Sequence, residues 1–338
     1  MPKRIGAFGE VMMRLQVPGV QLLSQGNSLN YSFSGTGVNV SSALARFGHE
    51  GYLISRLPTT SLGEAAAAYL RKLGISSSLV IRGGEYLGLY FLENGFGARP
   101  SKVTYSNRLE SSFNTAPEET YDYEEIARNL DVIHFCGITL AMNESVRHHM
   151  KALARAVKQQ GGTVIFDCNY RPSLWGPEGY SLAKPHYEEM LQLADIVMMN
   201  EKDAIFILGM STVQAEREEQ LLELIPAVAK QYDISVIAGT HRSIHGDNSH
   251  SLRGFLYKNQ NFFFSDTLRF LVYDRIGAGD AFTSGIVHGE LTGFTPEQTV
   301  RFAAAASMLA HTVEGDTPMA SVADVLRAMT LSVGDVER

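Results

Sequence analysis

Residues 274–280 read DRIGAGD, a run that combines two glycines with an acidic residue at its end. Gly277 and Gly279 can adopt backbone angles that other residues avoid, so the N–H groups of Gly277, Ala278 and Gly279 can point at one spot. At a predicted helix N-terminus, such free N–H groups and the positive end of the helix dipole bind an anion. Asp280 repels that anion, which indicates that its carboxylate removes a proton from a hydroxyl while the amides hold a phosphoryl group. The alternative interpretation is an N-cap aspartate before an ordinary packed helix.

A second glycine-containing turn, at residues 34–37, opens a predicted helix of small residues that ends near Gly48. Gly35 lets a ligand approach the backbone closely. Asn39 is polar on a helix face that is otherwise suited to packing, so it is a candidate contact to a ligand. The chain therefore has one candidate binding turn near each end.

Short apolar runs rich in branched residues alternate with helical patterns along most of the chain. This alternation predicts an α/β fold with a mostly parallel sheet and helices on both of its faces. The expected strands cover residues 5–9, 51–55, 132–135, 163–167, 196–199 and 235–238, with a further pair in 255–273. The expected helices cover residues 38–47, 63–73, 144–160, 220–231, 279–291 and 301–311.

Two segments, at about residues 12–34 and 86–108, interrupt this alternation. Each reads as strand, turn and strand, with Pro18-Gly19 in the first and a glycine-rich turn at 94–97 in the second. Together they predict a small sheet that projects from the α/β body and serves as a lid over a pocket or as a dimer contact. The alternative is a pair of surface hairpins without a role.

The composition excludes several classes of protein. A net charge of −7 over 338 residues argues against nonspecific nucleic-acid binding, which needs a basic face. The two cysteines, Cys136 and Cys168, form neither a zinc signature nor a disulfide framework. The sequence contains no apolar run of the ~20 residues that cross a membrane, and its start lacks a signal-peptide pattern. We expect a cytoplasmic protein that binds neither nucleic acid nor membrane.

The two binding turns, taken with the βαβ order, resemble the signature regions of the ribokinase-like (phosphofructokinase-B) sugar kinases over essentially the whole chain. The resemblance implies one kinase domain, residues 1–338, with a three-layer α/β/α body and a small β-sheet lid inserted into it. It implies ATP and Mg²⁺ as cofactors, Asp280 as the catalytic base, and Gly277, Ala278 and Gly279 as the anion hole.

The same resemblance assigns the nucleotide and metal residues. In the family, an Asn-x-x-Glu motif at a strand end organises metal and phosphate; the matching residues here are Asn200 and Asp203, so aspartate replaces glutamate. Its shorter arm can act through a water, since Mg²⁺ keeps several waters. Thr240 and Arg242 follow the last core strand and, with Gly277 and Gly279, are candidate ATP contacts, although Arg242 can equally be solvated. Asp274 matches a residue that lies near a monovalent cation in some members.

Three further motifs resemble 2-keto-3-deoxygluconate kinases within the family, namely residues 9–15, 88–112 and 167–175. The resemblance implies phosphorylation of the C6 hydroxyl of that sugar acid, with Gly35, Asn39, Tyr90, Tyr105, Arg108, Arg171 and Asp280 around the substrate. A sugar carboxylate taken out of water needs charged partners, and Arg108 and Arg171 can converge on it. Tyr105 stands three residues before Arg108, where the subfamily has two, and a bulge can restore the alignment. Arg171 can alternatively anchor the loop at 167–175.

Other functions remain open at this point. The nearest is the same chemistry on fructose or another keto-sugar or keto-sugar acid. A noncatalytic sugar-sensing or scaffold protein is a second, and a nucleoside kinase of the same fold is a third. The lid sheets also predict a homodimer or a higher homo-oligomer, since exposed strand edges pair readily.

Overall fold

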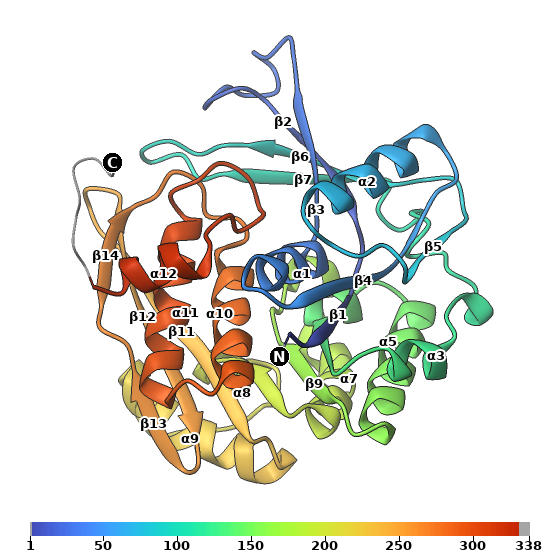
Figure 1. Cartoon of the computed structure of the whole chain (residues 1–338). Coiled ribbons are helices and arrows are strands. Elements are labelled where there is room, and N and C mark those ends of the chain that lie inside the picture. The colour runs from blue at the N-terminus through green and yellow to red at the C-terminus, as the bar shows by residue number, and fades with distance from the viewer. Residues whose placement is uncertain (1, 331–338) are drawn as a thin grey trace.

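The structure, a computed structural model, describes residues 2–330. A central sheet runs through the body in the order β13-β12-β11-β10-β9-β8-β1-β4-β5, and β14 pairs with β12 beside it (Figure 1). The strands from β11 to β5 are parallel, whereas β12 runs antiparallel to β11, β13 and β14. The bounds are β1 (Arg4–Phe8), β4 (Glu50–Leu57), β5 (Val80–Arg82), β8 (Val132–Cys136), β9 (Thr163–Asp167), β10 (Ile196–Met198), β11 (Val236–Ile244), β12 (Ser249–Lys258), β13 (Asn261–Phe264) and β14 (Leu268–Leu271).

Helices cover both faces of this sheet because its central strands are apolar on both sides, as parallel strands usually are. On one face, Leu153 and Tyr187 pack with Phe166 of β9 in the largest apolar cluster. On the other face, Leu44 and Phe302 belong to a second cluster. The bounds are α1 (Thr36–Arg46), α2 (Ser61–Lys72), α3 (Tyr123–Arg128), α4 (Gly137–Leu140), α5 (Glu144–Gln159), α6 (Pro172–Trp175), α7 (Gly179–Leu193), α8 (Glu201–Phe206), α9 (Arg217–Tyr232), α10 (Ala278–Thr292), α11 (Pro296–Ala310) and α12 (Val322–Ala328), with a 3₁₀ turn at Glu118–Thr120.

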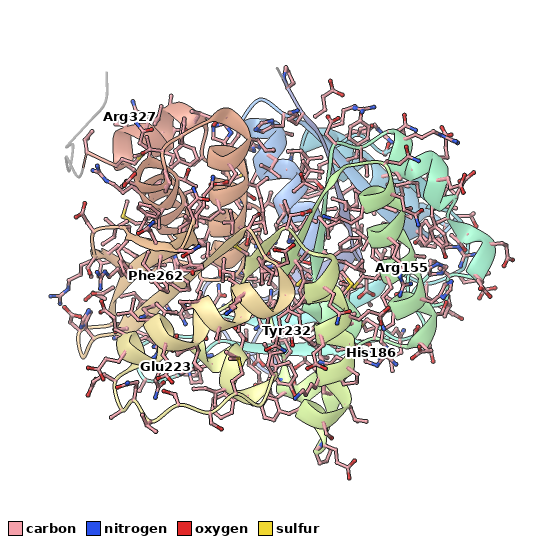
Figure 2. The ribbon with its side chains drawn as sticks, turned by 90° about the horizontal axis from the view of Figure 1, so that it is seen from below. Arg155, His186, Glu223, Tyr232, Phe262 and Arg327 are labelled. Atoms are coloured by element: carbon pink, nitrogen blue, oxygen red, sulfur yellow. The ribbon has the colours of Figure 1, made fainter. Side chains whose placement is uncertain are left out.

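The first of these faces also carries charged contacts at its surface. Figure 2, which views the molecule from below, shows Arg155 of α5 and His186 of α7. Arg155 and Lys151 of α5 both pair with Glu189 of α7, so the two helices are linked outside the apolar cluster as well as within it. Ion pairs at the surface contribute only about 0–1 kcal/mol each, and these are partly exposed, so packing rather than charge holds this layer.

A second, four-stranded sheet stands over the body at the top of Figure 1. Its order is β3 (Asn30–Ser34), β2 (Met12–Gln16), β6 (Gly88–Glu93) and β7 (Lys102–Ser106). The outer pairings are antiparallel, and β2 runs parallel to β6. These strands lie within the two segments from which the sequence predicts the lid, and we call this sheet the lid sheet.

The predicted strands and helices are present, with shifts of a few residues at their ends. The expected strand at 235–238 continues to Ile244, because β11 pairs with β12 along its whole length. Helix α7 lies outside the predicted helices; Pro185 inside it weakens the helical pattern, since proline removes a backbone donor. No helix within residues 2–330 is both long enough and apolar enough to span a bilayer.

Candidate active site

A cavity of about 750 Å³ lies between the lid sheet and the carboxyl ends of the parallel strands. Ligands of open α/β sheets bind at these strand ends, where loops converge. The wall includes Met12, Ser34, Tyr90, Val103 and Tyr105 from the lid sheet, Asp167, Met198 and Thr240 from the strands of the body, and Gly277, Ala278, Gly279 and Asp280 at the start of α10. The two candidate binding turns, far apart in the sequence, therefore meet in one cavity.

The turn before α10 adopts a backbone that requires glycine. Gly277 has φ 83°, in the left-handed region, and a Cβ there would overlap the carbonyl oxygen of Asp316. Gly279 is different, because apart from its chain neighbours and the backbone of its own helix no atom of the described residues lies within 4 Å of where its Cβ would be. Since Gly279 lines the cavity, that open space lets a ligand approach the first N–H groups of a 15-residue helix. The turn is thus built to receive an anion.

Asp280, in the first turn of α10, is 6% exposed and lines the same cavity. Asn39 Nδ2 donates a hydrogen bond of 2.7 Å to its Oδ2. Burial raises the pKa of Asp280 to about 8; Asn39 and Arg171 oppose the rise, and the charges of Asp167 and Asp316 add to it. A carboxylate with such a pKa accepts a proton far more readily than an ordinary aspartate does, as a general base requires.

The first binding turn supports this aspartate. Gly35 has φ 155° and lies against the carbonyl oxygen of Glu10, so that a side chain has no room there. Asn39 lines the cavity from α1, and its Oδ1 accepts a hydrogen bond of 3.4 Å from Thr317. The structure therefore places Asn39 as the hydrogen-bond partner of Asp280.

The two predicted tyrosines both reach the cavity from the lid sheet. Tyr90 is buried; its hydroxyl donates to Asp316 and lies 2.9 Å from the Ser34 hydroxyl. Tyr105 is 44% exposed, and its ring centroid lies 6.3 Å from that of Tyr90. These rings give the part of the cavity under the lid sheet an apolar wall.

The two predicted arginines occupy different environments. Arg171 lines the cavity, and among residues 2–330 no carboxylate forms an ion pair with it. Arg108 does not line the cavity: it is 8% exposed, and its Nε donates 2.8 Å to Oε2 of Glu10. Its guanidinium carbon lies 4.8 Å from the centre of the Tyr105 ring. The two arginines therefore do not converge on one spot in the cavity, as the sequence led us to expect, because the carboxylate of Glu10 binds the guanidinium of Arg108.

The residues expected to bind the nucleotide also line the cavity. Thr240 and Arg242 are joined there by Arg275, to which the sequence assigns no role. Burial lowers the pKa of Arg242, and the positive charge of Arg275 lowers it further. Neither forms an ion pair with a carboxylate in the described part of the chain. Two like charges held together without a counterion favour a polyanionic ligand.

The candidate metal residues belong to a capping box at the start of α8. Asn200 Oδ1 accepts from the N–H of Lys202, and Asp203 Oδ2 accepts from the N–H of Asn200, both within 2.9 Å. Both residues line the cavity, and burial raises the pKa of Asp203 to about 6. Glu201, by contrast, is fully buried and bonded to Arg217 and His241, so it is already paired.

These groups fit Mg²⁺ only in the loose manner that is common in kinases. Within the described residues, no cluster of three His, Cys, Asp or Glu side chains is suited to hold a metal. Mg²⁺ usually keeps several waters and takes one or two carboxylates in addition to the phosphates of its substrate. Asp203 and Asp167 are two acidic groups on the cavity wall, the number of carboxylates that such a site uses.

The candidate monovalent-cation residue, Asp274, already has a cationic partner. Arg14 of β2 places Nη2 2.8 Å from Oδ2 of Asp274, and its Nη1 donates to Asp316. The guanidinium thus supplies the positive charge beside Asp274.

Three residues of the cavity wall are not among those predicted from the sequence. Arg275 and Asp167 lie inside the motifs at 274–280 and 167–175, whereas no pattern in the sequence around Asp316 indicates a site.

A carboxyl group with a raised pKa beside an anion-binding helix start is typical of enzymes that transfer a phosphoryl group to a hydroxyl. The chain belongs to the pfkB family of carbohydrate kinases, whose family model matches residues 2–322. It is therefore a sugar kinase, as the sequence predicts.

Individual relatives agree with this class and with the fold. A crystal structure from Enterococcus faecalis, of a protein proposed to be a 2-keto-3-deoxygluconate kinase, is 39% identical, covers 99% of each chain and has a TM-score of 0.95. That of 2-dehydro-3-deoxygluconokinase from Thermotoga maritima is 31% identical, covers 97% of this chain and 99% of its own, and has a TM-score of 0.92. The 2-dehydro-3-deoxygalactonokinase of Haloferax volcanii is 27% identical over 339 residues, which is 100% of both chains. The predicted ribokinase-like fold is confirmed.

Proposed function

We propose that this sugar kinase transfers the γ-phosphoryl group of ATP to the C6 hydroxyl of 2-keto-3-deoxygluconate, giving 2-keto-3-deoxy-6-phosphogluconate. The observation that carries the proposal is a single cavity that holds the raised-pKa carboxyl of Asp280 and the guanidinium of Arg171 without a carboxylate partner among residues 2–330. The names of the relatives from Enterococcus and Thermotoga support the same substrate class.

The reaction needs a base, an anion hole and a nucleotide site. Asp280 takes the proton of the C6 hydroxyl while the oxygen of that hydroxyl bonds to the γ-phosphorus of ATP. The bond from that phosphorus to the bridging oxygen breaks, and ADP leaves with the electron pair. The backbone N–H groups of Gly277, Ala278 and Gly279 hold the charge on the moving phosphoryl group, which is catalysis by positioning and electrostatics.

Arg242 and Thr240 contact the ATP phosphates in this proposal, since a guanidinium matches phosphate geometry. Mg²⁺ would be held through water by Asn200 and Asp203, and when bound it supplies charge neutralisation on the phosphates. Both residues line the same cavity as Thr240.

The substrate side recognises an acid. Arg171 binds the sugar carboxylate, because a charge removed from water needs a charged partner. Gly35 and Asn39 face the sugar from α1, and Tyr90 and Tyr105 pack on it. Arg108 acts through Tyr105, on whose ring its guanidinium lies. Closure of the lid sheet would exclude water and so prevent wasteful hydrolysis of ATP.

We also propose that two copies pair through their lid sheets. The two segments that form the lid sheet carry exposed apolar side chains that do not line the cavity, among them Leu22, Leu29 and Phe96, and an open sheet edge favours pairing. Light scattering at working concentration checks this: a monomer would remove the dimer from the proposal without touching the chemistry.

The test of the function is ADP release by the purified chain with Mg-ATP, across a set of acceptors. The acids are 2-keto-3-deoxygluconate, 2-keto-3-deoxygalactonate, 2-ketogluconate and 5-keto-2-deoxygluconate, and the neutral acceptors are fructose, ribose and adenosine. Asp280→Asn serves as the inactive control, so that ADP release by a contaminating kinase is recognised.

Each outcome decides between the functions that the sequence leaves open. Turnover with the deoxy keto acids alone supports the proposal, and the ratio of the two epimers gives the stereochemistry. Turnover mainly with fructose, ribose or adenosine supports a kinase activity but contradicts the proposed binding of a sugar carboxylate by Arg171. Silence with every acceptor removes the proposed substrate and favours a sugar-sensing protein.

A further inference from the structure

Arg14 is an arginine in the middle of lid strand β2, and it is 2% exposed. It is among the largest fully buried side chains of the molecule. A buried guanidinium is costly unless it is paired and fully hydrogen-bonded. Its partners therefore show what the protein gains by keeping it there.

Each nitrogen of this guanidinium has an acceptor. Nη2 donates 2.8 Å to Oδ2 of Asp274, and Nη1 donates to Oδ1 of Asp316. Nε donates 3.0 Å to Gln16 of the same strand, and Gln16 in turn donates 3.2 Å to Glu314. Burial lowers the pKa of Arg14, but the charges of Asp316 and Asp274 more than offset this, so it stays ionised. Residues 260 and 302 positions away in the chain thus meet at one lid residue.

Both aspartates also contact the backbone of the phosphoryl-transfer turn, Asp274 through its carboxylate and Asp316 through its main chain. Asp274 Oδ1 accepts the N–H of Ile276 at 3.1 Å, and its Oδ2 accepts that of Gly315 at 3.3 Å. The main chain of Asp316 lies directly against Gly277, in the space where a Cβ would be. Arg14 therefore reaches the anion-binding turn from both sides, through Asp274 at its start and Asp316 across from it.

We propose that Arg14 is a positioning residue for phosphoryl transfer, which fixes the 274–280 turn to the lid sheet so that the amides and Asp280 keep their places. This inference rests on the function proposed above and deepens it. Arg14 touches neither the sugar nor the nucleotide in this proposal. It acts through Asp274 and Asp316, and it couples the position of the lid sheet to that of the turn.

The guanidinium of Arg14 also neutralises the negative charge of Asp316, which acts on Asp280. The charged or titratable groups that face Asp280 are Asp167 and Arg171 at the end of β9, Asp316, and Cys136 of β8, with Asn39 of α1 as hydrogen-bond donor. Asp316 raises the pKa of Asp280, and Arg14 lies against Asp316. Without Arg14, that negative charge is uncompensated, so the pKa of Asp280 rises further. The acid limb of the pH profile then moves to higher pH.

The test compares four proteins: wild type, Arg14→Gln, Arg14→Lys, and the double variant Arg14→Gln/Asp316→Asn. The double variant keeps the net charge of the trio Arg14, Asp274 and Asp316 at −1, so it remains a folded reference if Arg14→Gln alone does not fold. Arg4→Gln is the matched control, since it also removes an ion pair between distant segments, to Asp131, but lies away from the cavity.

Arg14→Gln should lower kcat by about 10- to 100-fold, in the range for misplaced groups in an anion hole, with KM changed by less than about threefold. Its acid limb should shift upward. Arg14→Lys should return the limb towards wild type and recover part of kcat. The double variant should restore the limb but not kcat, because the charge is balanced and the link is still missing.

A second readout does not depend on turnover. Hydrogen exchange at the amides of residues 276–280 and in β2 should accelerate in Arg14→Gln and in the double variant, and stay unchanged in Arg4→Gln. Unchanged exchange, or wild-type kcat and pH profile in both Arg14 variants, overturns the inference. Failure of the proposed function looks different: the wild type does not phosphorylate the acids, whereas the exchange experiment still decides the role of Arg14.

Discussion

Asp280→Asn separates the chemistry of the base from the energetics of burying it. The variant keeps the shape of the side chain, and its amide oxygen still accepts the hydrogen bond that Asn39 donates to Asp280 at 2.7 Å. It cannot take a proton from a hydroxyl. We expect kcat to fall by about 10²- to 10⁴-fold, the usual contribution of a general base, with little change in KM.

The same substitution should stabilise the fold at alkaline pH. Burial raises the pKa of Asp280 from an ordinary 3.8 to about 8, so the folded state binds this proton more tightly than the unfolded chain does. The stability that the proton contributes is complete below pH 3.8 and is lost as the pH rises through 8. With ~1.4 kcal/mol for each pKa unit, the charged carboxylate costs at most about 6 kcal/mol above pH 8. Asparagine carries no such cost.

Chemical unfolding at pH 5 and at pH 8.5 measures this difference, with Glu119→Gln, which removes an exposed carboxylate, as the control. The gap in unfolding free energy between Asp280→Asn and wild type should be small at pH 5 and several-fold larger at pH 8.5. Near-normal turnover in the variant would refute the base. An equal gap at both pH values would refute the buried, raised-pKa carboxyl.

Four further predictions concern single contacts in or near the cavity. Arg171→Ala should raise KM for the sugar acid by about 10- to 100-fold, the worth of one charge-assisted hydrogen bond, and leave KM for a neutral sugar unaffected. Arg108→Ala should instead lower the free energy of unfolding, because it leaves the buried carboxylate of Glu10 without its cationic partner. Steady-state kinetics and denaturant unfolding of both variants check this. Gly279→Ala should stabilise α10 by roughly 0.5–1 kcal/mol and yet lower kcat/KM at least about tenfold, because its methyl group enters the open space beside the amides; equal activity would contradict the anion site. Turnover should be the same in sodium, potassium and tetramethylammonium salts, since Arg14 already supplies the charge beside Asp274, and a strong preference for potassium in the initial rate would disprove this.

The features that the sequence predicts correctly are local ones. The βαβ alternation depends on short strands of three to nine residues, and the glycine turn at 274–280 depends on backbone angles that only glycine adopts freely. Asp280 and its flanking glycines could therefore be placed at a helix start in advance. The Asn200–Asp203 pair carries a double signal, because the same spacing is a capping box and a family motif.

The features that the sequence does not predict depend on pairs far apart in the chain. Glu10 and Arg108 are 98 residues apart, and nothing in either neighbourhood indicates that the carboxylate takes the arginine away from the cavity. Arg14 shows no distinguishing feature within a strand of alternating residues, and its partner Asp316 is 302 residues away. Periodicity and spacing describe what one segment can do. The choice of partner for a buried charge is made by the tertiary fold.

The proposed role of Arg171 would couple acid recognition to the titration of the base. The charge of Arg171 lowers the pKa of Asp280. A sugar carboxylate bound to Arg171 would neutralise that charge, and the pKa of Asp280 would then rise towards the value that its burial favours. We therefore expect the acid limb of the pH profile of kcat to lie at higher pH with the sugar acid than with a neutral sugar, and equal limbs for the two substrates would contradict the coupling.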